Sequence, residues 1–280
     1  MIPVKQAHLH VAALSHMGMV RKNNEDNFAV SAFQLSEKDP TPVVFAILCD
    51  GIGGHKAGEV ASEMAVNRIS AGVARSDGAH PTEILRVAFR ETNEKIVAAA
   101  RDNPDRKGMG ATLACAWVIG RRLYTASAGD SRTYLVRAGS IQQLNIDHTW
   151  LQEAIEKGAV DPAKVKDAPN LHVIRRHLGS EKENEPDFRL RLRDGETNEQ
   201  MLANQGTPLL PGDVLVLCSD GLTDYLKSSE ILGVMQKTKN LNASVKTLVD
   251  QANQRGGQDN ITVVMLMMPW DADKQGWFNR

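Results

Sequence analysis

Residues 43–49 read VVFAILC and are apolar at every position. A strand with one face in water alternates apolar and polar side chains, so an unbroken apolar run of this length predicts a strand covered on both faces. Such cover requires a layer of structure on each side of the sheet that contains the strand. This requirement limits the chain to layered folds built around a central sheet.

Other segments carry the patterns of strands and helices in an order that indicates mixed layers. Strand-like runs occur at residues 8–14, 27–33, 43–49, 111–120, 122–129, 131–139, 213–219 and 260–268. Helical spacing of apolar residues is found at 59–75 and 82–101. A shorter helix is expected to start at Thr149, and another to start with Asn242 as its N-cap. The order predicts an α+β fold of largely antiparallel sheets covered by helices.

The composition limits the kinds of partner and compartment. The formal net charge of the 280 residues is −1, without a block of like charge, which argues against nucleic acid or a membrane as the main partner. The three cysteines each lie in an apolar run, which favours reduced thiols over a disulfide framework or a zinc site. The first residues contain no apolar signal segment. We therefore expect a cytoplasmic monomer.

Three aspartates stand at the ends of apolar runs. Asp50 and Asp220 each follow a predicted strand, and Asp259 precedes one. If the third strand runs antiparallel to the others, the three carboxylates converge on one sheet edge. Clustered carboxylates repel one another and lose hydration unless a cation lies among them. Because all candidate ligands are oxygens, Mg²⁺ or Mn²⁺ is expected rather than Zn²⁺.

Each acidic motif also has an ordinary structural explanation when it is considered alone. An Asp-Gly pair after a strand, such as Asp50 and Gly51, is most often a turn, and the sequence AGDS at 128–131 is also typical of a hairpin tip. The glycines match neither a P-loop nor a dinucleotide-binding fingerprint. The number and order of the motifs therefore carry the functional interpretation.

Seven segments of the chain together carry this functional interpretation. They are GMVRKNNEDNF (18–28), CDGIGGHKAGEVAS (49–62), MGATLACAWV (109–118), YTASAGDSRTYLVRAG (124–139), DHTWLQEAIEKG (147–158), CSDGLTDYL (218–226) and GGQDNITVVML (256–266). In this order they resemble the bacterial form of the type 2C, metal-dependent serine/threonine protein phosphatase family. The resemblance implies a four-layer α-β-β-α sandwich of two antiparallel sheets flanked by helices. It also implies a catalytic domain at 1–268, a flap beside the active site at about 159–207 and a C-terminal tail at 269–280.

The resemblance also implies the metal ligands. By this match, Asp50 bridges two divalent ions, the carbonyl group of Gly51 binds one of them, and Asp220 and Asp259 complete the second. Asp130, together with Asp220, matches the residues that hold a weaker third ion in bacterial members. The implied cofactors are two Mn²⁺ or Mg²⁺ ions and a weaker third.

Four further residues have roles implied by the resemblance. Arg21 matches the phosphate-binding arginine, and its guanidinium group is suited to pair with two phosphate oxygens. Glu25 and Asp26 are expected to orient water, and Asn260 to tether a loop. The implied catalytic set is Arg21, Asp50, Asp220 and Asp259.

Two departures from the family pattern concern the proton donor and the flap. Animal members place a histidine directly after the metal-binding Asp-Gly, where this chain has Ile52, so water is the expected acid. His55 is expected to cap or pack instead. Arg175 stands where the family commonly has threonine, which leads to the hypothesis that acidic phosphopeptides are favoured.

The implied reaction is hydrolysis of phosphoserine and phosphothreonine in proteins by a water molecule that two metal ions activate. One alternative is a hydrolase of small phosphate esters that uses the same metals. Another is an inactive phospho-binding regulatory module, which predicts loss of Arg21 or of a metal aspartate; neither is lost. The expected partners are phosphorylated proteins, including a serine/threonine kinase that the enzyme opposes.

Overall fold

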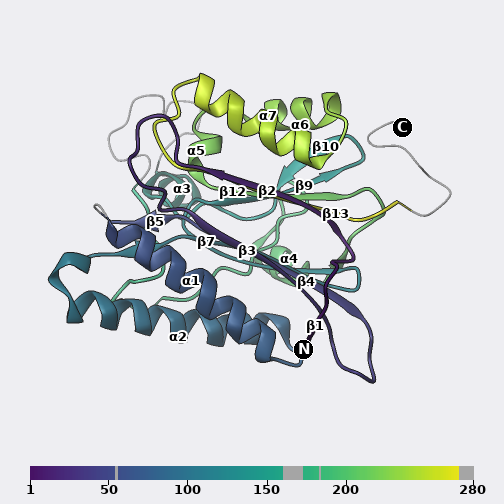
Figure 1. Ribbon diagram of the computed structural model, residues 1–280, viewed down its shortest axis with the longest axis horizontal. Helices are drawn as coiled ribbons and strands as arrows, with labels where there is room; N and C mark the ends of the chain where they lie inside the picture. The colour runs from purple at the N-terminus through teal and green to yellow at the C-terminus, as the bar shows by residue number, and fades with distance from the viewer. Residues whose placement is uncertain (54–55, 160–172, 183, 271–280) are drawn as a thin grey trace.

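Two antiparallel sheets pack face to face between two helical layers in the computed structural model, which describes residues 1–53, 56–159, 173–182 and 184–270 (Figure 1). One sheet has the strand order β1 (Ile2–Pro3), β3 (Asn27–Gln34), β4 (Pro42–Cys49), β7 (Leu113–Ile119), β8 (Arg122–Ala128) and β11 (Thr207–Pro208). The other has the order β10 (Ser140–Gln143), β9 (Arg132–Arg137), β12 (Val214–Cys218), β13 (Ile261–Met267) and β2 (His10–His16). A short ribbon pairs β5 (Gly51–Ile52) with β6 (Gly110–Ala111). The predicted sandwich is confirmed.

Two pairs of helices form the outer layers. Figure 1 shows α1 (Lys56–Arg75) and α2 (Pro81–Asp102) against the sheet that contains β4, and α6 (Ser228–Lys237) and α7 (Leu241–Gln254) against the sheet that contains β12. Shorter helices are α3 (Trp150–Glu156), α4 (Asn198–Ala203) and α5 (Asp220–Thr223), with a 3-10 turn at Pro104–Arg106. None of the helices in the described ranges combines the length and apolarity that a membrane span requires.

Alternation along the central strands explains why their sequences are apolar throughout. In β4, one set of side chains packs with α1 and α2, namely Val43, Phe45, Ile47 and Cys49. The intervening side chains lie in the layer between the two sheets, namely Val44, Ala46 and Leu48. Strand β12 divides in the same way between the α6–α7 layer and the layer between the sheets. Both faces of these strands are therefore buried, as the unbroken apolar run predicts.

The observed N-caps confirm one predicted helix start and correct another. Thr149 is the N-cap of α3, and its hydroxyl group accepts a hydrogen bond of 3.2 Å from the Gln152 amide. The prediction of Asn242 as the cap of α7 is wrong, because the side chain of Asn240 accepts the Ala243 amide at 2.9 Å and the helix begins earlier. Sequence periodicity did not predict α4 or α6.

The described part of the predicted flap is attached on two sides. Isolated β-bridges join Ile174 to Thr149 and Asp187 to Ser127. From α2, Asn93 accepts the Gly179 amide at 2.8 Å. Residues 160–172 and 183 of the predicted flap, and 271–280 of the predicted tail, lie outside the described residues. At the start of that tail, the ring of Trp270 covers the backbone of Gly212.

Candidate metal centre

A cavity of about 210 Å³ contains most of the predicted site residues. It is lined by Arg21, Glu25, Asp50, Gly51, Ile52, Gly53, Ile174, Asp220, Asp259 and Asn260. The three aspartates predicted from strand ends therefore lie around one space. Ile52 is part of its wall, whereas His55 lies outside the described residues.

The three aspartates come from two sheets, which corrects the expectation that they share one sheet edge. Asp50 follows β4 in one sheet. Asp220 follows β12 and Asp259 precedes β13, and these two antiparallel strands are neighbours in the other sheet. The cavity therefore lies where the ends of both sheets meet, so its shape depends on how the sheets stack.

Two glycines are required by close backbone approaches beside the aspartates. A Cβ atom on Gly51 would lie 2.4 Å from the carbonyl group of Gly58 in α1. A Cβ atom on Gly221 would lie 2.0 Å from the carbonyl oxygen of Asn260. No side chain fits at these distances, so the glycines let α1 and the loop before β13 approach the aspartates.

Thr112 fixes the backbone at the end of β4. Its amide donates to the Asp50 carbonyl oxygen at 2.8 Å, and its hydroxyl group accepts the Asp50 amide at 2.8 Å. The same hydroxyl group lies 2.7 Å from that of Ser131, which follows Asp130 in the chain. Thr112 thereby joins the Asp50 backbone to the side chain of Ser131, the residue after Asp130, a function that the sequence did not reveal.

Asn260 ties together the loop that carries Arg21 and Glu25. Its side-chain oxygen accepts the Glu25 amide at 2.7 Å, and its amide group donates to the carbonyl oxygens of Met17 and Asn23 at 3.0 and 2.9 Å. Arg21 contacts Asp259 at 2.6 Å, with 54% of its own side chain exposed. Hydrogen bonding with Asp259 raises the pKa of Arg21. The guanidinium group is thus held at the mouth of the cavity.

Burial and mutual repulsion raise the pKa of four neighbouring carboxyl groups, of which Asp50 and Asp220 line this cavity. They are Asp26, Asp50, Asp130 and Asp220. The pKa of Asp220 rises to about 6, because the group is buried and faces Asp224 and Asp259. Burial is also the largest cause that raises the pKa of Asp26 and of Asp130 to about 7. Burial, followed by the charge of Asp26, raises the pKa of Asp50 well above its usual value.

A second, smaller cavity of about 90 Å³ adjoins this cluster. Asp130, Asp220 and Asp224 all line it, together with the ion pair of Arg132 and Asp147. Asp224 was not among the predicted site residues. Its signal in the sequence is the spacing of four residues from Asp220, which places two carboxylates on one face at α5.

The chemistry of the acidic cluster fits a hard divalent cation. The Oδ1 atoms of Asp26, Asp130 and Asp220 are buried without a hydrogen-bond partner. Oxygen-only donors of this kind suit Mg²⁺ or Mn²⁺. Across the described ranges, no three His, Cys, Asp or Glu side chains are already arranged as a complete metal site.

Together, the two-sheet sandwich and the acidic cavity at its end are the features that the comparisons with known proteins have to match. The family model for protein phosphatase 2C matches residues 11–154. The serine/threonine phosphatase stp of Listeria welshimeri is 32% identical over 92% of this chain and 95% of its own length. The chain belongs to the protein phosphatase 2C family, and it is a protein serine/threonine phosphatase.

Solved structures with the same fold support this placement. The serine/threonine phosphatase of S. agalactiae superposes with a TM-score of 0.79 and 31% identity, over 92% of this chain and 99% of the other. The catalytic domain of the serine/threonine protein phosphatase PstP, solved with 2 manganese ions, gives a TM-score of 0.74 and 33% identity over 92% and 97%. Both likenesses extend over both sheets.

Proposed function

We propose that this chain removes phosphate from phosphoserine and phosphothreonine in proteins with two Mn²⁺ or Mg²⁺ ions at the acidic cavity. The observation that carries this proposal is the group of buried carboxylates that have raised pKa values and unpaired oxygens. Two manganese ions in the related PstP structure support the choice of ion and the number. The metal dependence of the family supports the same conclusion.

Asp50, after β4, and the carbonyl group of Gly51, in β5, are two of the proposed ligands, and Asp220 and Asp259, beside β12 and β13, are the others. Asp130, with Asp220, is the proposed site of a weaker third ion. When bound, such ions supply Lewis-acid polarisation of the phosphoryl group and make water more acidic. The side chains themselves hold negative charge at fixed positions.

Arg21 is the proposed phosphate-binding residue. Its guanidinium group is half-exposed at the cavity, so it can exchange Asp259 for two phosphate oxygens. Glu25 and Asp26 are the proposed residues that orient the attacking water. Asp26 is well placed for a fixed orientation, because Ser219 donates a hydrogen bond of 2.8 Å to its other oxygen.

The substrates we propose are phosphorylated proteins, including a serine/threonine kinase that this phosphatase opposes. A monomer in the cytoplasm, a catalytic domain at 1–268 with its flap at about 159–207, and a tail at 269–280 also remain proposals. The alternative of an inactive phospho-binding module is disfavoured by the presence of Arg21 and of the four proposed metal-binding aspartates, Asp50, Asp130, Asp220 and Asp259, around the two cavities.

The test is phosphate release from a phosphothreonine peptide and from p-nitrophenyl phosphate, with Mn²⁺, Mg²⁺ or EDTA. We expect metal-dependent turnover of the peptide that is lost in EDTA and in Asp259→Asn. The matched control is Asp250→Asn, an exposed aspartate on α7 that pairs with Lys246. Turnover of the small ester alone would favour the small-ester hydrolase, and a folded, inactive protein that binds the peptide would favour the regulatory module.

A further inference from the structure

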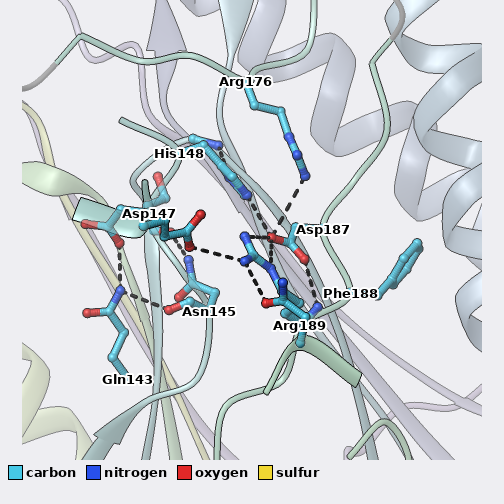
Figure 2. A network of polar contacts seen from close by, with 12 residues as sticks. Gln143, Asn145, Asp147, His148, Arg176, Asp187, Phe188 and Arg189 are labelled. Carbon is cyan, nitrogen blue, oxygen red and sulfur yellow. Dashed lines mark hydrogen bonds and ion pairs between the residues drawn. The ribbon is translucent and has the colours of Figure 1, made fainter. Parts of the chain in front are cut away.

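His148 bridges two parts of the chain through its two ring nitrogens, and the network around it is drawn in Figure 2. The Gly129 amide donates to Nδ1 at 3.1 Å, and Nε2 lies 3.0 Å from Oδ2 of Asp187. Because Nδ1 accepts a hydrogen bond, the proton of the neutral ring is on Nε2, which donates to Asp187. The buried ring therefore has one orientation and one tautomer.

The Gly129 end of this bridge controls the turn that carries Asp130. The amide of His148 also donates to the Gly129 carbonyl oxygen at 2.9 Å, so both backbone groups of Gly129 are held by one residue. Gly129 has a φ of +100°, and a Cβ atom there would lie 2.7 Å from Cγ2 of Thr112. The turn is thus pressed against Thr112, which also fixes the Asp50 backbone.

The Asp187 end of the bridge keeps the ring in place. Although burial alone raises it, the pKa of Asp187 is held well below its usual range by hydrogen bonds from His148 and Arg189. Arg189 approaches the carboxylate at 2.7 Å, and Arg176 lies 3.9 Å from it (Figure 2). The Asp187 backbone pairs with Ser127 in β8 in both directions. Asp187 is therefore a fixed acceptor rather than a mobile surface group.

We propose that His148 is a positioning residue for the cation held at Asp130 and Asp220, with Asp187 as the group that orients its ring. This inference rests on the proposed function. His148, Gly129 and Asp187 are not among the residues that line the larger cavity. The effect of the bridge is to fix the Gly129–Asp130 turn, and Asp130, which carries an unpaired buried oxygen, lines the smaller cavity. Groups that orient metal ligands in this way commonly change metal affinity about 10- to 100-fold when removed.

Two substitutions separate the two ends of the bridge. In His148→Gln the side-chain amide reaches the position of Nε2, which keeps the contact with Asp187 and loses the one with Gly129. In His148→Asn the side-chain oxygen lies near the position of Nδ1, which keeps Gly129 and loses Asp187. The control is Asn93→Ala. It removes the hydrogen bonds to Gly179 and Ser180, in the segment that leads to Asp187, without touching the Asp130 turn.

The measurement is Mn²⁺ binding to the substrate-free protein by isothermal titration calorimetry, together with kcat and KM for a phosphothreonine peptide. We expect His148→Gln to weaken the lowest-affinity Mn²⁺ site about tenfold and His148→Asn about threefold, with the tighter sites unchanged. Asn93→Ala should leave the Mn²⁺ isotherm as in the wild type. The milder His148→Asn keeps the test open if His148→Gln does not fold.

An unchanged isotherm in folded His148→Gln would overturn the proposal and leave His148 a packing residue. Equal weakening of every Mn²⁺ site would also overturn it, because the bridge would then act on the whole fold. Failure of the proposed function has a different signature. The wild type would bind Mn²⁺ and release no phosphate from any peptide, while the variants still test the weakest site.

Discussion

Two groups of buried aspartates in this molecule differ in one respect, the presence of a cationic partner. Asp213 is 2% exposed and receives hydrogen bonds of 2.6 to 3.1 Å from the Arg137 guanidinium group. Asp130 is 7% exposed and Asp220 is partly buried, but each has a buried oxygen without a hydrogen-bond partner. Burial of side-chain oxygens therefore occurs in both groups, and the unpaired oxygens of Asp130 and Asp220 are what support the proposed metal site at the acidic cavity.

The largest expected difference between the two groups concerns activity. Asp50→Asn should lower kcat for a phosphothreonine peptide about a thousandfold, because a metal ligand loses its charge. In EDTA its melting temperature should stay at or above that of the wild type, since a repelled carboxylate has been removed. Calorimetry alongside the assay checks both. If Asp50→Asn were strongly destabilised in EDTA, Asp50 would contribute to stability without a metal, as the paired Asp213 does, and the contrast between the two groups would be wrong.

The second comparison concerns stability. Asp213→Asn should lower the free energy of unfolding by about 2 kcal/mol, because it leaves Arg137 without its ionic partner, and Arg137 is partly exposed, which limits the loss. Urea denaturation in EDTA measures the change. The kcat of the folded variant should match the wild type. A change in kcat without a change in stability would contradict this assignment.

The third comparison concerns pH. In EDTA, the folded protein keeps protons on Asp26 and Asp130 up to a pKa of about 7, whereas the unfolded chain releases them near pH 4. Stability from these raised groups is therefore present at low pH and lost as the pH rises toward 7. Asp187, whose pKa is lowered, contributes fully above pH 4 and does not mask the trend.

Mn²⁺ should reverse this dependence, because the ion competes with protons for the same oxygens. We expect the rise in melting temperature on adding Mn²⁺ to be several-fold greater at pH 8 than at pH 5. Thermal unfolding at fixed ionic strength, with and without Mn²⁺, tests this. An equal rise at both values would indicate that the carboxylates do not titrate in this range.

The smallest expected effect is on substrate choice. Arg175 lies 3.6 Å from Glu153 and is half-exposed, so its charge is partly neutralised and screened. Arg175→Thr should lower the ratio of turnover on acidic to basic phosphopeptides about twofold at low salt, and less at high salt. An unchanged ratio at low salt would end the hypothesis of an acidic preference.

The sequence predicted those features that local pattern determines. The apolar run at residues 43–49 indicated a strand with two covered faces, and β4 is such a strand. Asp50, Asp220 and Asp259 were expected to converge from their places at strand ends, and they line one cavity. Their origin in two sheets was not predictable in this way, because strand order depends on pairings between distant segments.

Residues that act through the backbone were also missed. Thr112 and His148 contribute by holding the amides of Asp50 and Gly129, and such contacts leave no periodic signal in a sequence. Asp187 lies in a stretch without clear periodicity, where only its partners reveal its importance. Recognition of the family motifs reached the aspartates, Arg21 and the loop-tethering Asn260, but it assigned no function to Thr112 or His148.

The origin of the aspartates in both sheets has a mechanical consequence. An ion held by the proposed ligands Asp50 on one side and Asp220 and Asp259 on the other would connect the ends of the two sheets. The affinity for this ion would depend on the spacing between the two sheets. That spacing is set by the apolar layer between them, which includes Leu48, Leu215 and Leu217. Replacing these leucines with smaller residues should therefore weaken binding of the cation, although none of them is a proposed ligand. Ion affinity would then report how closely the two sheets are stacked.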